Sequence, residues 1–238
     1  MITTIWGRAG AGKTTVAVNL AVALANKGKI IGIISSNLQY GHLQILFGQT
    51  VFDKHGTYKA IEDNDAINHY WKSGINENIF LMSVPNEYCR LDYETVTSKQ
   101  AEDIFAQSSA HFDCVIVDGH EDIGNPISSV ALTMSANVLM LHRPSIASCS
   151  WYASKKEVLS LLRIDNRLIH IINAYDGSCK LDDYIGRTGI NAKLELPFVA
   201  EAPVLENMGT PIFNSDSKKI REYKSILNKI AEVISVEQ

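Results

Sequence analysis

The stretch Gly7-Arg8-Ala9-Gly10-Ala11-Gly12-Lys13-Thr14 comes directly after the apolar run Ile2–Trp6 and directly before a helical pattern. It fits G-x-x-x-x-G-K-[ST], in which a glycine-rich turn joins a strand to a helix. Glycine lets the backbone turn consecutive N–H groups inward, and the positive end of the following helix adds to their attraction for phosphate. The alternative is an ordinary glycine turn in front of a helix. We interpret the stretch as a phosphate-binding loop.

Two side chains at the end of this loop have the chemistry to hold a nucleotide and its metal ion. Lys13 is expected to neutralise the β- and γ-phosphates, and Thr14 is expected to supply a hydroxyl to Mg²⁺. The sequence therefore predicts ATP and Mg²⁺ as cofactors. The expected nucleotide-binding segment consists of Gly7, Arg8, Ala9, Gly10, Ala11, Gly12, Lys13, Thr14 and Thr15.

A second motif is Phe112-Asp113-Cys114-Val115-Ile116-Val117-Asp118-Gly119, an apolar run that ends in a carboxylate and a glycine. Ligands of parallel sheets bind at the carboxyl ends of the strands, so Asp118 is expected beside the loop, where it can hold a Mg²⁺-bound water. Thr14 and Asp118 are thus the candidate metal ligands. The alternative is a carboxylate that caps the next turn.

The rest of the chain alternates short β-rich apolar runs with stretches long enough for a helix. This alternation predicts an α/β fold, with a mostly parallel twisted sheet and helices on both faces. No repeat or linker divides the chain, so we expect a single nucleotide-binding domain over residues 1–238, with one or two short helices in the polar stretch Asp53–Asn78. The predicted strands are Ile2–Trp6, Ile30–Ile34, Ile79–Val84, Cys114–Val117, Val138–Leu141, Leu168–Ile172 and Lys193–Leu196, and the predicted helices are Thr14–Asn26, Ser98–Ser109, Ser148–Leu162 and Ser217–Ile234.

Composition limits the classes of partner. The chain has 238 residues, 46% of them hydrophobic, and a formal net charge of −4. It has no overall basic field, so non-specific binding to DNA or to an acidic membrane would need a local patch. The chain starts without a basic segment, cleavage site or long apolar span, which predicts a cytoplasmic protein. The cysteines Cys89, Cys114, Cys149 and Cys179 are far apart in the sequence, and we expect reduced thiols.

At these motifs the chain resembles the MinD/ParA group of deviant Walker A P-loop ATPases, whose loop reads GKGGVGKT. The resemblance covers nearly the whole length. It implies that Asn173, after the run Ile171-Ile172, reads the adenine edge, and that the loop from Leu196 to Pro211 closes over the base. Pro197 and Phe198 in that loop are therefore candidate nucleotide-binding residues. Asn is also a common turn former at the end of a strand, which is the alternative for Asn173.

The stretch Asn37-Leu38-Gln39-Tyr40-Gly41-His42-Leu43-Gln44-Ile45-Leu46 is similar to the D-L-D-L-Q-F-G-D segment of the CpaE/TadZ branch of this group. That branch positions pilus-assembly and secretion machinery at a site in the cell. The resemblance implies an ATP-dependent homodimer with a protein partner in a pilus, secretion or positioning system. The alternative interpretation is a generic loop between a strand and a helix.

The chain departs from the family pattern at two places. Arg8 stands where the family has its signature lysine; it keeps the charge and could reach the phosphates of a neighbouring subunit, or it could be merely solvated. Lys13, Arg8 and Asp118 are the candidate catalytic residues. Ser35 and Asn37 stand where the family pattern has two aspartates, and this predicts weak or absent hydrolysis because a missing catalytic group costs about 10²- to 10⁴-fold in rate. Glu121 or Asp122 could supply a substitute carboxylate, or could be a solvated loop charge.

The sequence is compatible with three functions. The first is a nucleotide-dependent positioning or assembly factor that dimerises on ATP. The second is a catalytic or metallocluster-insertion ATPase, which paired cysteines would favour. The third is a ParA-type partition ATPase acting on DNA segregation, for which the sequence offers only scattered pairs such as Lys155-Lys156, so DNA is not the expected partner. Membrane association through Ser217–Ile234 is a weaker alternative, because the same apolar stripe can close the core.

Overall fold

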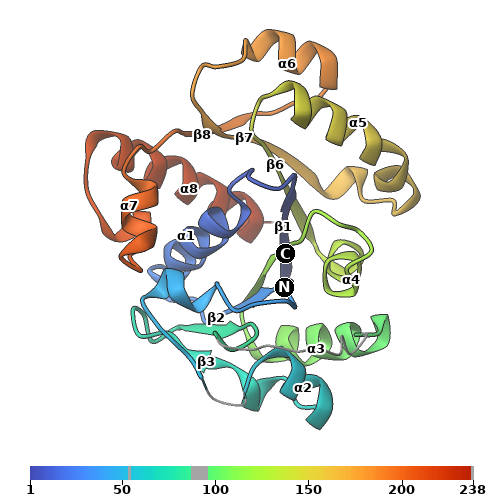
Figure 1. Cartoon of the computed structure of the whole chain (residues 1–238), viewed down its shortest axis with the longest axis vertical. Coiled ribbons are helices and arrows are strands. Elements are labelled where there is room, and N and C mark those ends of the chain that lie inside the picture. The colour runs from blue at the N-terminus through green and yellow to red at the C-terminus, as the bar shows by residue number, and fades with distance from the viewer. Residues whose placement is uncertain (53–54, 87–95, 237–238) are drawn as a thin grey trace.

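The computed structural model describes residues 1–52, 55–86 and 96–236, and within them one sheet forms the middle layer (Figure 1). The strand order is β3-β4-β2-β5-β1-β6-β7-β8, so β3 and β8 are its two ends. All pairings are parallel except β3 with β4, which confirms the mostly parallel sheet. The strands are β1 Ile2–Gly7, β2 Ile31–Ser35, β3 Trp71–Lys72, β4 Ile79–Met82, β5 Cys114–Asp118, β6 Asn137–His142, β7 Leu168–Tyr175 and β8 Leu194–Pro197.

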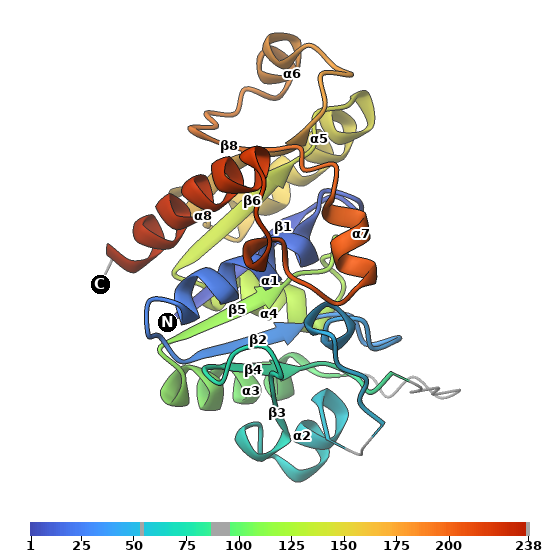
Figure 2. The same cartoon turned by 90° about the vertical axis from the view of Figure 1, so that its left-hand side faces the viewer.

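Helices cover both faces of the sheet, as the alternation predicts. One face carries α1, α7 and α8, and the opposite face carries α3, α4, α5 and α6 (Figures 1 and 2). The α-helices are α1 Lys13–Ala25, α2 Thr57–Asp63, α3 Ser98–His111, α4 Pro126–Met134, α5 Ile146–Leu161, α6 Leu181–Thr188, α7 Ala202–Asn207 and α8 Lys218–Val236. Short 3₁₀ turns are η1 Gln44–Phe47, η2 Ile67–His69, η3 Asp165–Arg167 and η4 Ile212–Asn214.

The alternation of side chains along β1 divides the apolar interior into two layers. Ile5 faces the layer formed with α1 and α8, whereas Ile2 and Trp6 face the helices of the other side. Every residue of β1 is buried, as expected for a central parallel strand covered on both faces. This strand is therefore fixed from both sides, and so is the start of the loop that follows it.

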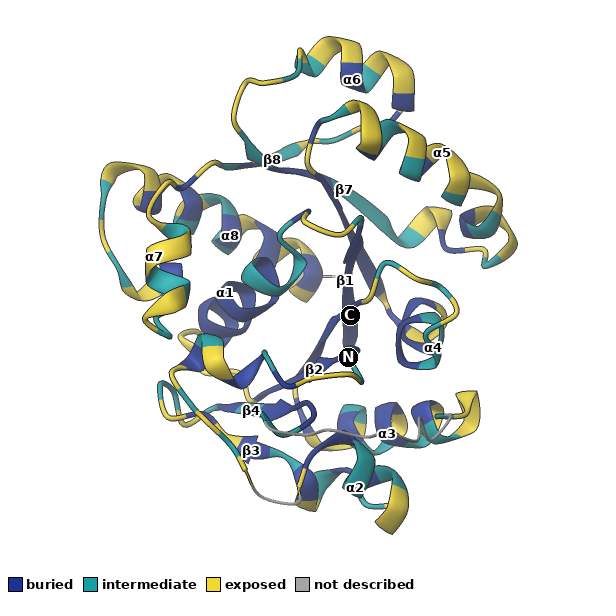
Figure 3. Cartoon of the chain, in the orientation of Figure 1, coloured by how far each residue is buried: buried dark blue, intermediate teal, exposed yellow. Residues whose placement is uncertain are grey.

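Helix α1 is buried on all sides, not on one stripe. Every residue from Val16 to Ala25 is buried, and the small alanines let the helix lie between the sheet and α8 (Figure 3). Helix α8 covers α1 with an apolar stripe of Ile220, Tyr223, Leu227, Ile230 and Ile234. The stripe thus closes the core, which was the simpler of the two interpretations of this segment. Within the described residues, no helix is both long enough and apolar enough to cross a membrane.

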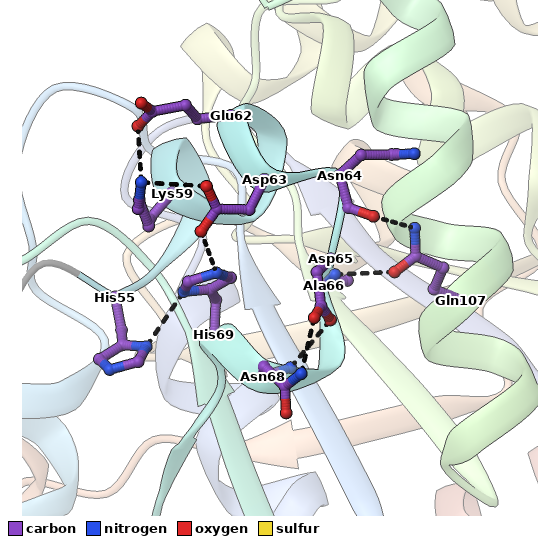
Figure 4. Close-up of polar contacts among 10 residues, drawn as sticks. All are labelled: His55, Lys59, Glu62, Asp63, Asn64, Asp65, Ala66, Asn68, His69 and Gln107. Atoms are coloured by element: carbon purple, nitrogen blue, oxygen red, sulfur yellow. Dashed lines mark hydrogen bonds and ion pairs between the residues drawn. The ribbon is translucent and has the colours of Figure 1, made fainter.

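The polar stretch after residue 54 folds into α2, η2 and the short strand β3, which confirms the expected short helices. Figure 4 shows Asp63 between Lys59 and His69. The Asp63 carboxylate lies 3.0 Å from Lys59 Nζ and 3.0 Å from His69 Nε2. His69 Nδ1 in turn lies 3.0 Å from His55 Nδ1. On the other side of the turn, the Gln107 amide of α3 accepts from the Ala66 N–H at 2.7 Å. Ala60 and Ala66 also belong to the same buried apolar cluster as Ile104 and Phe105 of α3, so polar contacts and apolar packing together hold this outer turn to α3.

A buried polar network joins β6 to α5 and α6. His142 Nδ1 lies 2.9 Å from Tyr184 Oη, which is also 2.9 Å from Ser148 Oγ, and His142 Nε2 lies 2.9 Å from His170 Nδ1. Burial lowers the pKa of His142 to about 3, and the neighbouring His170 acts in the same direction. The imidazole is therefore neutral in the folded protein at physiological pH.

This network predicts a pH dependence of stability. The unfolded chain takes up a proton on His142 near its ordinary pKa of 6.5, whereas the folded chain excludes that proton down to about pH 3. The contribution of His142 to the free energy of unfolding is therefore fully present above pH 6.5. It is lost as the pH falls from 6.5 to about 3, by at most about 1.4 kcal/mol per pH unit. His142→Gln is expected to reduce the slope of unfolding free energy against pH by about this amount between pH 4 and 6. Urea unfolding followed by circular dichroism measures it. Parallel curves for the wild type and the variant would contradict it.

Candidate functional site

The central strand β1 ends at the point where the sheet changes its direction of winding. From β1 the chain crosses to β2 on one side, beyond β5, and later crosses from β5 over β1 to β6 on the other side. In open parallel sheets, ligands bind at such a switch point, outside the carboxyl ends of the strands. The loop from Gly7 to Thr14, the end of β5 and the end of β7 all lie at this edge.

Two glycines allow the loop to fit against its neighbours. A Cβ at Gly7 would lie 2.6 Å from the Leu141 carbonyl oxygen of β6. Gly12 caps α1 in a left-handed conformation with φ 84°, and a Cβ there would lie 2.5 Å from Asn173 Nδ2. A larger residue at either position would move the loop away from the strands that frame it. The loop is thus a close-fitting turn whose N–H groups lead into the first turn of α1.

Lys13 curls back over the loop. Its ammonium group donates to the Arg8 carbonyl at 3.1 Å. Burial lowers the pKa of Lys13, while the carboxylates of Asp118 and Glu121 act in the opposite direction and favour the charged form. A cation held between the loop and two carboxylates is well placed to neutralise a phosphate.

Thr14 and Asp118 meet as the sequence motifs predict. The Thr14 hydroxyl donates to Asp118 Oδ2 at 2.8 Å, and Asp118 is only 5% exposed. His42 Nε2 lies 3.6 Å from the same carboxylate oxygen. A hydroxyl and a carboxylate in contact at the start of the helix are the oxygen donors that Mg²⁺ binds, directly or through water. The residues present therefore fit a magnesium ion bound with phosphate.

Asn173 fixes the loop from the side of β7. Its amide nitrogen donates to the Ala11 carbonyl at 2.7 Å, and this contact is buried. The next residue, Ala174, has a positive φ of 51°, and the pairing of β7 with β8 is irregular between Asn173 and Tyr175. Such strain in a non-glycine residue is typical of a functional site.

The cavity beside Asn173 brings together the residues expected around a base. It has a volume of about 170 Å³ and is lined by Gly12, Arg143, Asn173, Pro197, Phe198 and Glu206, among others. The Thr15 hydroxyl donates to the Glu206 carboxylate of α7. Apolar walls with a few converging polar groups are typical of small-molecule sites.

Comparison with known proteins gives the family and the fold of the chain. A family model described as an AAA domain, AAA_31, matches residues 1–171, which is more than half of the chain. The chain belongs to the AAA domain family. It is 23% identical over 243 residues to the septum site-determining protein MinD of Thermotoga maritima, covering 94% of this chain and 85% of that protein.

Two solved structures show the same fold as this AAA domain. One is the septum site-determining protein MinD of Pyrococcus horikoshii complexed with Mg-ADP, with a TM-score of 0.79, 16% identity and coverage of 100% and 98% of the two chains. The other is a ParA family ATPase of Chlorobium tepidum, with a TM-score of 0.79, 14% identity and coverage of 97% and 98%. The MinD/ParA fold predicted from the loop is therefore confirmed.

The positions that replace the expected aspartates have structural roles in this AAA domain. Ser35 is buried at the end of β2, and its hydroxyl accepts from the Asn37 N–H at 3.2 Å. The Asn37 side chain accepts from the Gln39 N–H at 2.9 Å and so closes a local turn. Both side chains organise the loop after β2.

Several residues at the site are absent from the sequence-based candidates. Arg143 directly follows β6 and so could have been found by asking which charged residues end a strand of the sheet. Its guanidinium lies 3.6 Å from the Asp176 carboxylate. His42 and Glu206 come from loop and helix segments with no such signal, because only the fold brings them to the edge.

The contact between Asn173 and the loop can be tested without any ligand. Asn173→Ala leaves the buried Ala11 carbonyl without its donor, so we expect a loss of about 1–3 kcal/mol of stability and faster hydrogen exchange of the amides of residues 8–14. The measurements are urea unfolding and exchange followed by mass spectrometry. Asn207→Ala, at an exposed position of α7, is the matched control. Equal effects of both variants would show that Asn173 does not brace the loop.

Proposed function

We propose that this chain is an ATP-binding protein that holds Mg-ATP on residues 7–15 and works as a single nucleotide-binding domain. The observation that carries the proposal is the contact of Thr14 with Asp118 at 2.8 Å, directly beside the close-fitting glycine loop and the Lys13 cation. In this assignment the loop N–H groups and Lys13 bind the phosphates, and Thr14 and Asp118 hold the metal ion. The Mg-ADP bound by the similar MinD of Pyrococcus horikoshii supports it.

The base is assigned to the cavity of Asn173, Pro197 and Phe198. Asn173 uses one of its two amide hydrogens on Ala11, which leaves the other and the oxygen for the edge of the base. Phe198 is 43% exposed and lines the cavity with Pro197, so its ring is available for stacking on a planar ligand.

We further propose that ATP binding forms a homodimer across this same edge. The segments after η1 and α7 meet there, and a Cβ on Gly209 would lie 2.4 Å from Gly48 Cα. Around them lies an exposed apolar surface of Tyr40 (56% exposed), Ile45 (45%), Val204 (62%) and Met208 (70%). Apolar surface next to a ligand site is typical of an interface, and Arg8 lies on the same edge.

The biological role that we propose is a positioning or assembly factor with a protein partner. The stretch Asn37–Leu46, which resembles the CpaE/TadZ segment, forms the loop and 3₁₀ turn at the proposed dimer edge, and this supports a pilus or secretion system as the setting. Because His42 of this loop contacts Asp118, a change of nucleotide at Thr14 and Asp118 can alter the surface that a partner binds.

The alternative functions find less support in the structure. Lys155 and Lys156, the basic pair considered for DNA, lie over the rings of Trp151 and Tyr152 at 6.0 and 5.5 Å. Cys114, Cys149 and Cys179 are free thiols, and Cys89 lies outside the described residues. The described part of the chain holds no group of three metal-binding side chains. The positioning role is therefore our proposal.

Binding and dimer formation are tested together. Lys13→Ala removes the charge-assisted contacts with the phosphates and is expected to weaken ATP binding about 10- to 100-fold by calorimetry at millimolar Mg²⁺. Arg8→Ala is expected to keep binding but to lose the ATP-dependent dimer in size exclusion with light scattering. Lys27→Ala, at the opposite end of α1, is the control for loss of a lysine. No heat from adenine nucleotides with the wild type would end the proposal.

Hydrolysis is expected to be slow. Ser35 and Asn37 offer no carboxylate, so the purified protein without a partner should turn over ATP below about 0.1 s⁻¹, compared with roughly 10 s⁻¹ for a typical enzyme. Phosphate release, measured with Lys13→Ala as the blank, checks this. Turnover of several per second would show that another group does the work of the missing aspartates.

A further inference from the structure

One amide group of the phosphate loop, that of Ala9, already has an internal anion as a partner. The carboxylate of Glu121, Oε2, accepts the Ala9 N–H at 2.5 Å. Glu121 is half-buried and comes from the loop between β5 and α4, three residues after Asp118. It also acts electrostatically on Lys13. A side-chain carboxylate therefore takes a place at the loop that the proposed function gives to phosphate.

The direction of Glu121 is set by the anchored residues beside it. The Trp6 indole donates to the His120 carbonyl at 2.6 Å, and the His120 N–H donates to Ser128 Oγ at 2.7 Å. The next carboxylate behaves differently, because Asp122 Oδ1 accepts from the Gly124 N–H at 2.9 Å and closes its own turn. Two neighbouring acidic residues thus have different tasks, and only Glu121 is directed at the nucleotide loop.

Glu121 lies at the end of the site that the proposed function assigns to the β- and γ-phosphates. Lys13 and the Thr14–Asp118 pair mark the end where the β- and γ-phosphates and the metal bind. The nucleoside end is marked by the cavity of Asn173 and Phe198, where Glu206 contacts Thr15. Because Glu121 interacts with Lys13 and with Ala9, it is found at the first of these ends.

We propose that Glu121 is a specificity residue that favours ADP over ATP, by occupying the Ala9 amide that the terminal phosphate of ATP must take. The inference rests on the proposed function and adds to it. In this proposal ADP, which lacks the γ-phosphate, binds with Glu121 in place. ATP brings a further anion, so Glu121 must leave the Ala9 amide and the vicinity of Lys13 before the γ-phosphate can enter.

Hydrogen bonds connect the loop that carries Glu121 to the loop after β2. In the same loop, the Asn125 side chain donates to the Ser36 carbonyl at 2.8 Å, and the Ser36 hydroxyl donates to the Asp118 carbonyl at 2.6 Å. Movement of residues 119–125 therefore reaches the loop after β2. Glu121 thereby links the presence of the terminal phosphate to the surface proposed for the dimer.

The test compares two nucleotides in four proteins. Calorimetry with Mg-ADP and with Mg-AMPPNP, a non-hydrolysable ATP analogue, is carried out on the wild type, Glu121→Gln, Glu121→Ala and Asp122→Asn. We expect the ratio of AMPPNP to ADP affinity to rise in Glu121→Ala on the order of tenfold. Glu121→Gln loses the charge but can still accept from Ala9, so its increase should be smaller. Asp122→Asn should keep the wild-type ratio.

The outcomes separate the inference from the proposed function. If the wild type binds both nucleotides and neither Glu121 variant changes the ratio, Glu121 is not a specificity residue, while ATP binding stands. If the Glu121 variants bind AMPPNP more weakly than the wild type does, Glu121 assists the terminal phosphate and the inference is overturned. If the wild type binds neither nucleotide, the proposed function itself fails.

Discussion

The site depends on the burial of α1 between the sheet and α8. Because each residue from Val16 to Ala25 is buried, the helix can neither rotate nor slide without exposing apolar surface. Its first turn therefore points its N–H groups in one fixed direction, beyond the end of β1. Gly12 and Asn173 then fix the loop against β7. The precision of the phosphate cradle thus comes from the hydrophobic core below it.

The second constraint is the adjacency of β1, β2 and β5. Parallel pairing brings Ser35 level with Asp118, and the strand ends are tied by the bond from Ser36 to the Asp118 carbonyl. The loops after β2 and β5 consequently share hydrogen bonds instead of moving independently. A ligand that shifts one loop therefore also shifts the other, and this is the physical basis for the coupling that we propose between nucleotide state and a surface.

The sequence predicted the seven longer strands and the four longest helices, because their apolar periodicity is set locally. It also predicted that Asp118 meets Thr14, since both motifs end at the same edge of a parallel sheet. The helices α4, α6 and α7 and the strand β3 are too short to give a clear apolar period. Glu206 and His42 reach the site through long-range folding, so local patterns carry little sign of them, whereas Arg143 could have been found from its place after a predicted strand. For Glu121 and Asp122 the sequence left the roles open, and their partners in the structure distinguish them, because Glu121 accepts from Ala9 and Asp122 from Gly124.

The end strand β8 bears on how copies of the protein meet. An uncovered strand offers unpaired backbone groups to any extended segment nearby, which is a common route to unwanted polymers. Strand β8 is short, carries the exposed charge of Glu195, and ends at Pro197, which has no backbone N–H to donate. Pairing of β8 with a strand of a second molecule is therefore disfavoured. Copies of the protein are left to associate through contacts between side chains instead of through backbone hydrogen bonds.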